Sequence, residues 1–363
     1  MSEKSPTGPR SENPLIDRVR AARSAASAPT LQHPDVASWR TATPDDIDAI
    51  HDLTVQVDRV DHPTWTTPRQ DIADTFDLPH IDQSRDTIVA FGADGRPVAF
   101  GSAFLHPSRD GALTVHLSGA VVPDLWRRGI GTQVFGWQVA RALEQLAEAA
   151  ETPGAAEWTA EITVFAEETN VGHQRLAEGR GFTPQRWFAT MLRDMGDAVP
   201  DVAPSESVRA AGIAVVPFTH DRDDDMRLAR NDAFRDHWGS LPSQPASWAK
   251  FIGGEFFRPD LSRLAVDADG AIVAFCLASV NEDDWETLGA TNSYIDLIGV
   301  VRSHRRQGLA PLVVSQSLRA IAEAGLEKAV LDVDTASPTG ADALYVGLGF
   351  TATERSVALV RAL

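Results

Sequence analysis

Cysteine, tyrosine and lysine are scarce in this chain of 363 residues, and each scarcity is informative. The single cysteine, Cys276, excludes any disulfide bond within the chain. It lies in the apolar run AIVAFCLASV, where a buried packing role is expected rather than a nucleophile. No apolar run is long enough to cross a membrane, and the N-terminus lacks the apolar core of a signal sequence. The sequence therefore predicts a cytoplasmic protein.

Positive charge is also limited. The formal net charge is −18, and the only lysines are Lys4, Lys250 and Lys328, so almost all positive charge is carried by arginine. A strongly acidic surface repels nucleic acid and anionic membranes, which argues against both as partners. The same charge favours a cationic substrate, although solubility alone also explains it. The turns at Asp94-Gly95 and Asp269-Gly270 lack the later glutamate of a calcium loop, so no metal site is predicted.

The chain is too long for one hydrophobic core, and two domains of about 160 residues are expected. Sequence markers support this division, because three of them occur twice and in the same order. They are Asp94-Gly95 and Asp269-Gly270, Gly129 and Gly308, and Gly181-Phe182 and Gly349-Phe350. The sequence therefore predicts a tandem duplication.

The predicted organisation has four parts. Residues 1–34 form a mobile N-terminal tail, in which residues 15–23 favour a short helix, and residues 197–211 form a linker. The two domains are residues 35–196 and 212–363. Each half follows the order strand, two helices, three strands, helix, strand, helix, strand. This order predicts an α/β (α+β) fold in which a mixed, mostly antiparallel twisted sheet is flanked by helices.

A strand, a basic loop and a helix start follow one another in both halves. In the second half, the apolar strand Ile295–Val301 contains Asp296 and leads into the basic loop 302–308. The helix after this loop begins near Leu309. Backbone amides at a helix start are unpaired and the helix dipole favours anions, so the pattern predicts a phosphate site. The first half repeats it from residue 113 to residue 131.

These motifs resemble the GNAT superfamily of N-acetyltransferases in both halves. The superfamily's acetyl-CoA loop reads Gln/Arg-x-x-Gly-x-Gly/Ala, and residues 305–310 (RRQGLA) satisfy it in full. In the first half Trp126 occupies the Gln/Arg position. The C-terminal signature Leu-Tyr-x-x-Leu-Gly-Phe is complete at residues 344–350. The tandem arrangement is similar to that of mycothiol synthase-like enzymes, although no residue ties the chain to that substrate.

The resemblance implies acetyl-CoA as co-substrate and transfer of its acetyl group to the amine of a small molecule. It also implies which residues contact the co-substrate. In the second half these are Val300, Val301, Arg305, Arg306, Gln307, Gly308, Leu309, Ala310 and Ser337. In the first half they are Val122, Arg127, Arg128, Gly129, Ile130, Gly131, Thr132 and Asn170.

Acyl transfer from a thioester to an amine needs a base for the amine and an acid for the leaving thiolate. Asp296 is our candidate base, because the family often carries an acid at this place; the alternative is a salt-bridged or edge-facing aspartate. His304 is a second candidate. The resemblance nominates Tyr345 as the acid, and the chain has only two tyrosines. The alternative for Tyr345 is a ring that packs on the sheet.

The first half departs from the family at both catalytic positions. Ala177 replaces the tyrosine, and Leu117 stands where the second half has Asp296. We therefore expect one active site, in the second domain. The first domain either binds acetyl-CoA without transferring from it or serves as a scaffold.

Acceptor specificity in this fold comes largely from the first two helices and their loop. There the sequence nominates Asp236, His237 and Trp238 for a cationic amine, and the counterpart at residues 58–63 repeats an Asp-His pair. The alternative is a helix C-terminus at which histidine suits the dipole. For the whole chain the alternative function is a non-catalytic tandem module that binds CoA or a partner. Either a monomer or a homodimer is compatible with the sequence.

Overall fold

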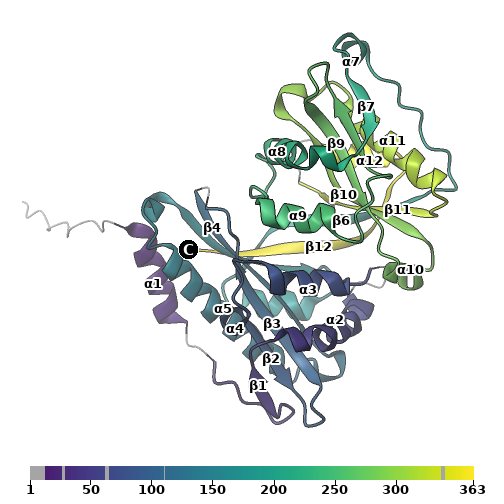
Figure 1. The fold of residues 1–363 in the computed structure, drawn as a ribbon. Helices are drawn as coiled ribbons and strands as arrows, with labels where there is room; N and C mark the ends of the chain where they lie inside the picture. The colour runs from purple at the N-terminus through teal and green to yellow at the C-terminus, as the bar shows by residue number, and fades with distance from the viewer. Residues whose placement is uncertain (1–12, 27–28, 62–64, 110, 337–339) are drawn as a thin grey trace, which may run out of the picture.

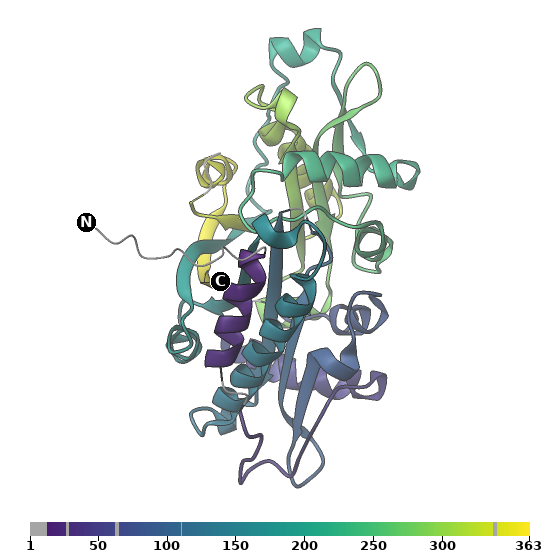
Figure 2. The same ribbon diagram turned by 90° about the vertical axis from the view of Figure 1, so that its left-hand side faces the viewer.

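A computed structural model describes residues 13–26, 29–61, 65–109, 111–336 and 340–363. Figure 1 shows two lobes, each with its own helices, joined through one continuous sheet. The view in Figure 2 shows that the lobes lie end to end along the long axis of the molecule. The strand β12 (Thr351–Ala362) runs between them, and the C-terminus lies in the lobe of the first half.

The first half follows the predicted order, preceded by the helix expected in the tail, α1, and with one short additional helix, α4. Its strands are β1 (Ser38–Arg40), β2 (Thr87–Phe91), β3 (Pro97–Leu105), β4 (Ala112–Val121), β5 (Thr159–Glu167) and β6 (Thr183–Asp194). Its helices are α1 (Pro14–Ala25), α2 (Ile47–Asp61), α3 (Arg69–Asp77), α4 (Gln83–Asp86), α5 (Ile130–Ala149) and α6 (Val171–Glu178).

The second half repeats the plan. Its strands are β7 (Ala214–Pro217), β8 (Arg263–Val266), β9 (Ile272–Ser279), β10 (Asn292–Val300), β11 (Lys328–Asp334) and β12. Its helices are α8 (Asp223–Ala233), α9 (Pro245–Gly253), α10 (Asp283–Leu288), α11 (Leu309–Glu323) and α12 (Ala341–Gly347), and α7 (Glu206–Ala210) precedes them in the linker. The helix α8 ends at Ala233, before the residues nominated for the acceptor, Asp236, His237 and Trp238.

The sheet has twelve strands in the order β1-β2-β3-β4-β5-β12-β6-β11-β10-β9-β8-β7. Within it β4 and β5 are parallel, as are β10 and β11, and every other neighbouring pair is antiparallel. The predicted mixed, mostly antiparallel sheet is therefore confirmed. The sequence did not predict that the sheet continues from one half into the other.

The two halves exchange their last strands. Strand β12, the end of the second half, pairs with β5 of the first, while β6 of the first half pairs with β11 of the second. The hydrophobic cores follow this exchange. Val357 and Leu359 on β12 lie in the core of the first half, and Ala189 and Met191 on β6 lie in the core of the second. Each half is therefore completed by a strand from the other.

The predicted N-terminal tail needs a correction. The helix expected within it forms, as α1, but it packs on α5 instead of moving freely. Leu15, Ile16 and Val19 are buried in the core of the first half, and the Asn13 side chain donates to the carbonyl of Ala150. Burial of these apolar side chains outweighs the polar composition of the tail. Residues 1–12 lie outside the described part of the chain.

Candidate active site

The two glycine loops share an unusual backbone conformation. Arg127 (φ 59°) and Arg306 (φ 63°) are the non-glycine residues with positive φ in the described part of the chain. Each precedes by two positions a glycine that is also left-handed, Gly129 at 102° and Gly308 at 84°. Non-glycine residues rarely adopt this region. The repeated geometry is independent support for the duplication, and it turns consecutive amides toward one face, as anion-binding turns do.

Both loops are held by the same side-chain contact. The indole N–H of Trp126 donates to the carbonyl of Val121, and Nε of Arg305 lies 3.5 Å from the carbonyl oxygen of Val300. Trp126 therefore reproduces the bond that the Gln/Arg position makes in the second half. Within the described residues, the backbone amides of Arg306, Gln307 and Gly308 have no backbone partner. These amides are available to an anion.

The central strands separate at different depths in the two halves. In the first half the parallel pairing of β4 with β5 continues to Leu117 and Val164. In the second half the pairing of β10 with β11 ends at Tyr294 and Val330, two positions before Asp296. A break in register against β9 between Ile295 and Leu297 places Asp296 in a β-bulge, whereas β3 and β4 pair in continuous register. Bulges re-aim side chains, so the second half is open at the position that carries the carboxylate.

Asp296 is chemically suited to accept a proton. Its side chain receives a hydrogen bond of 2.7 Å from the hydroxyl of Ser279, and no salt bridge to it occurs among the described residues. Burial raises the pKa of Asp296 to about 7, because the surrounding protein disfavours the charged form. A carboxyl group with this pKa exchanges protons at neutral pH.

Tyr345 lies on α12, where it belongs to the hydrophobic core of the second half. Its ring packs edge-on against Phe350 at 6.1 Å, and it is 7% exposed. Burial raises the pKa of Tyr345 above its ordinary value, so the hydroxyl keeps its proton at neutral pH. Among the described residues the hydroxyl has no hydrogen-bond partner, although its loop neighbours 337–339, including the predicted contact Ser337, lie outside them. Packing on the sheet and acid catalysis remain compatible with this placement.

In the first half, polar contacts occupy the corresponding loop and helix. His33 contacts the carbonyl oxygen of Arg128 at 2.8 Å, and Asp35 pairs with the guanidinium of Arg128 at 3.2 Å. The amide side chain of Asn170 caps α6 through His173 N and also donates to Asp61 at 2.8 Å. Asn170 therefore has little left to offer a CoA arm. The other predicted contacts of this half, Val122, Ile130, Gly131 and Thr132, belong to the same loop and helix start.

The residues nominated for the acceptor lie in the loop between α8 and α9, where the sequence placed them. Asp236 pairs with two arginines of the glycine loop, Arg302 and Arg305, the latter at 3.0 Å. Trp238 packs against Phe188 of β6, with ring centroids 6.2 Å apart, and His237 packs against Phe234. Asp236 thus contacts the glycine loop and Trp238 contacts the other half, while His237 packs within its own half. The comparable first-half positions His62 and Pro63 lie outside the described residues.

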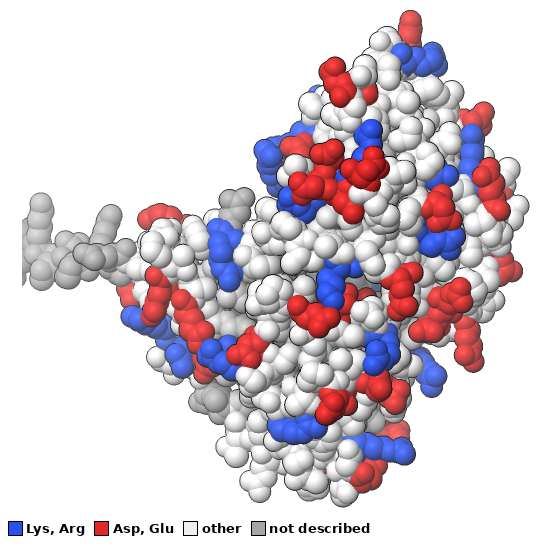
Figure 3. Space-filling model, viewed as in Figure 1, with Lys and Arg blue, Asp and Glu red and all other residues white. Residues whose placement is uncertain are grey.

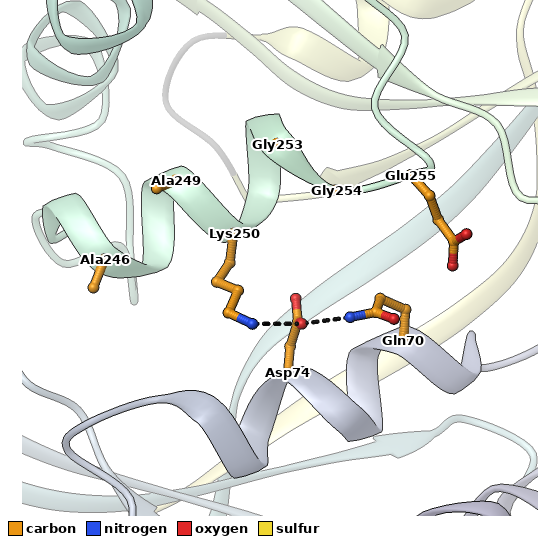
Figure 4. A pocket seen from close by; sticks show the side chains of 8 residues that line it. All are labelled: Gln70, Asp74, Ala246, Ala249, Lys250, Gly253, Gly254 and Glu255. Atoms are coloured by element: carbon orange, nitrogen blue, oxygen red, sulfur yellow. Dashed lines mark hydrogen bonds and ion pairs between the residues drawn. The ribbon is translucent and has the colours of Figure 1, made fainter.

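A cavity of about 490 Å³ opens between α3 of the first half and α9 of the second (Figure 4). Lys250 reaches from α9 to Asp74 on α3 at 3.2 Å, and Gln70 donates to the same carboxylate at 2.7 Å. Sequence reasoning missed this site. The available signals were three acids at a helical spacing, Asp71, Asp74 and Asp77, and a lysine in a chain that otherwise uses arginine.

The other predicted features are placed as follows. Cys276 is buried, and burial raises the pKa of its thiol to about 12, which confirms a packing role over a nucleophile. Among the described residues, no three or more His, Cys, Asp or Glu side chains gather as a metal site would require. Nor does that part of the chain contain a helix of the length and apolarity that a bilayer demands. On the face drawn in Figure 3, lysine and arginine side chains are scattered among acidic ones.

The central strands of the sheet separate, and the glycine loop that follows β10 has residues of positive φ and unpaired backbone amides. This combination is typical of the GNAT acyltransferase fold. Residues 224–350 match the model of the acetyltransferase (GNAT) family. The chain is 27% identical over 258 residues to a mycothiol acetyltransferase of Clavibacter michiganensis, an alignment that covers 71% of this chain and 74% of the relative.

Solved structures agree on the fold. A GCN5-related N-acetyltransferase from Sphaerobacter thermophilus superposes with a TM-score of 0.63 at 24% identity, covering 90% of this chain and 95% of that one. A tandem GNAT protein from the clavulanic acid biosynthesis pathway gives a TM-score of 0.59 at 18% identity, with 90% and 98% covered. Residues 224–350 therefore match a GNAT acetyltransferase domain, a family whose acetyl donor is acetyl-CoA, and over most of its length the chain is similar to tandem GNAT proteins.

Proposed function

We propose that the chain acetylates a small-molecule amine and that a single active site, in the second half, performs the reaction. The observation that carries this proposal is Asp296. It lies in a β-bulge beyond the point where β10 and β11 separate, and its pKa is raised to about 7. The equivalent position in the first half is Leu117, where the strands are still paired.

In the proposed mechanism the loop amides of the second half hold the pyrophosphate of acetyl-CoA. Asp296 takes a proton from the acceptor ammonium, directly or through water. The neutral amine then attacks the thioester carbonyl, a C–N bond forms and the C–S bond breaks. Tyr345 gives its proton to the departing thiolate and regains one from the second proton that the nitrogen loses, through water, so the products are the acetamide and CoA-SH.

The acceptor is proposed to be polar and cationic. The net charge of −18 favours a cation, and the relatives are named mycothiol acetyltransferases. The test is release of CoA-SH from acetyl-CoA with a panel of amines that includes glucosamine, spermidine, hexylamine and the unacetylated form of mycothiol. Turnover with at least one of them is expected. Tight acetyl-CoA binding without transfer to any amine would instead support a non-catalytic module.

The acid assignment has its own test. Tyr345→Phe keeps the ring that packs on Phe350 and removes only the hydroxyl. We expect kcat to fall by about 10²-fold or more, within the range that general acid catalysis contributes, while acetyl-CoA binding is unchanged. Normal turnover by this variant would remove Tyr345 from the mechanism and leave the rest of the proposal in place.

A further inference from the structure

The strands that join the two halves carry an acid that is open to solvent. Strand β11 lies between β10 and β6, where the two lobes meet (Figure 1). Along β11, Leu331 and Val333 are buried in the core of the second half, whereas Asp332 between them is exposed. Successive side chains of a strand point to opposite faces of the sheet. Asp332 therefore lies on the face opposite that core, which leaves this acid uncovered although its strand has a partner on each side.

Asp332 stands across the opening from the proposed base. The pairing of β10 with β11 ends at Tyr294 and Val330, and Asp332 is two positions beyond Val330, as Asp296 is two positions beyond Tyr294. Directly paired residues of neighbouring strands point to the same face, and Tyr294 is paired with Ser279 of β9. The hydroxyl of Ser279 donates to Asp296, and that of Tyr294 donates to Asp332. The two carboxyl groups therefore border the opening on the same face of the sheet.

Two hydroxyl groups hold the carboxylate of Asp332, one from each half of the chain. Thr190 of β6 is paired with Asp332 and donates to its Oδ1 at 2.6 Å, while Tyr294 donates to its Oδ2 at 2.9 Å. In the part of the chain that the structure describes, no lysine, arginine or histidine forms a salt bridge with Asp332. Neutral donors orient a carboxylate and favour its charged form without cancelling the charge. Asp332 is thus an oriented negative charge that faces solvent.

The row of polar side chains continues toward the first half. Glu354 of β12 is paired with Thr190, which in turn is paired with Asp332, so these three residues stand side by side on adjacent strands. Glu354 also lines a cavity of about 520 Å³, whose wall on the side of the first half includes Asp61 and Glu167. Neighbouring strands are roughly 4.8 Å apart, so a molecule about 10 Å long that starts at Asp332 and crosses β6 would reach this cavity.

We propose that Asp332 binds a second polar group of the acceptor, an ammonium or a hydroxyl, while Asp296 takes the proton from the reacting amine. This inference rests on the proposed function, since it assigns a specificity-determining residue to the same reaction. The two carboxylates flank one opening, so a single molecule can contact both. The acceptor class is an elongated amine with at least one further ammonium or hydroxyl group. Thr190 and Tyr294 are positioning residues, and through Thr190 the first half contributes to acceptor binding.

The experiment compares steady-state constants of the wild type and Asp332→Asn. Spermidine is the probe, and hexylamine is the amine that lacks a second polar group. We expect the KM for spermidine to rise about tenfold or more, because a charge-assisted contact is lost, and the KM for hexylamine to rise less. Calorimetric titration of spermidine into the CoA-bound protein should show a similar loss of affinity, and this measurement does not depend on turnover. Asp52→Asn, an exposed acid on α2, is the matched control and should behave as the wild type.

The two hydroxyl donors have a test of their own. Thr190→Val and Tyr294→Phe keep the shape of the side chain and remove one hydroxyl each. Either should raise the KM for spermidine about two- to tenfold, the factor that one neutral hydrogen bond contributes, with kcat nearly maintained. Adding Thr190→Val to Asp332→Asn should change the KM little further, because the hydroxyl acts through the carboxylate. Additive effects in the double variant would show that Thr190 has a structural role only.

The outcomes separate this inference from the proposed function. If Asp332→Asn acetylates and binds spermidine with wild-type constants, the inference is wrong while the proposed function stands. An equal loss in Asp52→Asn would trace the effect to the overall negative charge and would also overturn the inference. If the wild type transfers to no amine, the proposed function itself fails, and the calorimetric comparison alone decides whether Asp332 binds a cation.

Discussion

At the scale of single residues, the backbone around Asp296 accounts for its suitability as the proposed base better than the residue type alone does. The bulge between Ile295 and Leu297 interrupts the pairing of β10 with β9 at the one acid of an otherwise apolar strand, just beyond the point where β10 and β11 separate. Burial then moves its pKa from the acidic range to about 7. Neither effect can be read from the sequence, because both depend on how β10 pairs with its neighbours.

The pH dependence of turnover follows from this pKa. The base acts in its ionised form, so kcat/KM should rise with pH through about 7 and level off above it. The pH profile of Asp296→Asn should lack the acidic limb, and its residual rate should be lower than that of the wild type by about 10²-fold or more. Initial rates of CoA release between about pH 5.5 and 9 measure both. An unchanged acidic limb in the variant would assign the base to another group, with His304 as the next candidate.

Gly299 makes a residue-scale prediction about stability. A methyl group at this position would come within 2.3 Å of the Phe275 ring, which is fully buried. Gly299→Ala should therefore lower the free energy of unfolding by about 1–3 kcal/mol through overpacking. Urea denaturation measures the change. Gly253→Ala is the control, since nothing lies within 4 Å of its added methyl group and alanine favours a helix.

At the scale of elements, the repeated left-handed loops allow a matched test of which half binds acetyl-CoA. A side chain on either Gly129 or Gly308 meets no atom within 4 Å but is strained by the positive φ. Gly308→Val should raise the KM for acetyl-CoA about tenfold or more by distorting the amides that hold the pyrophosphate. Gly129→Val carries the same backbone strain and should leave that KM unchanged. Equal effects from both variants would show that the two loops cooperate in binding.

Most individual elements were predictable because their signals are local. Alternating and helical apolar patterns located the strands and main helices, and the strand, loop and helix around each glycine were predicted from Arg305–Ala310 and its first-half copy. The docking of α1 was missed because a polar tail gives no sign of its partner. The α3–α9 cavity was missed for a similar reason. Its residues are far apart in the chain, and only the arrangement of the two halves brings Asp74 to Lys250.

At the scale of the whole molecule, the exchange of β6 and β12 links the stability of the two halves. Removing residues 351–363 deletes a strand that covers β5 and buries Val357 and Leu359 in the first half's core. The truncated chain should therefore lose the fold of the first half, although the deleted residues belong to the second. Far-UV circular dichroism and limited proteolysis of the first-half peptides would detect this. A truncated chain with a protease-resistant first half would contradict it.

The same exchange predicts cooperative unfolding of the intact protein. Each half contributes a strand to the other's core, so neither can unfold without exposing apolar surface in both. Urea titration followed by tryptophan fluorescence and by circular dichroism should give coincident single transitions. Two separated transitions would mean that the halves are energetically independent despite the shared sheet.

The position of β12 far along the chain from its partner β5 also has a consequence for biosynthesis. During translation the first half emerges long before the strand that must lie beside β5, so this edge stays open until β12 has left the ribosome. An open edge is a site for pairing with other chains. A nascent chain stalled before Thr351 should thus be bound by chaperones for far longer than a nascent two-domain enzyme whose leading domain folds while the rest is still being made.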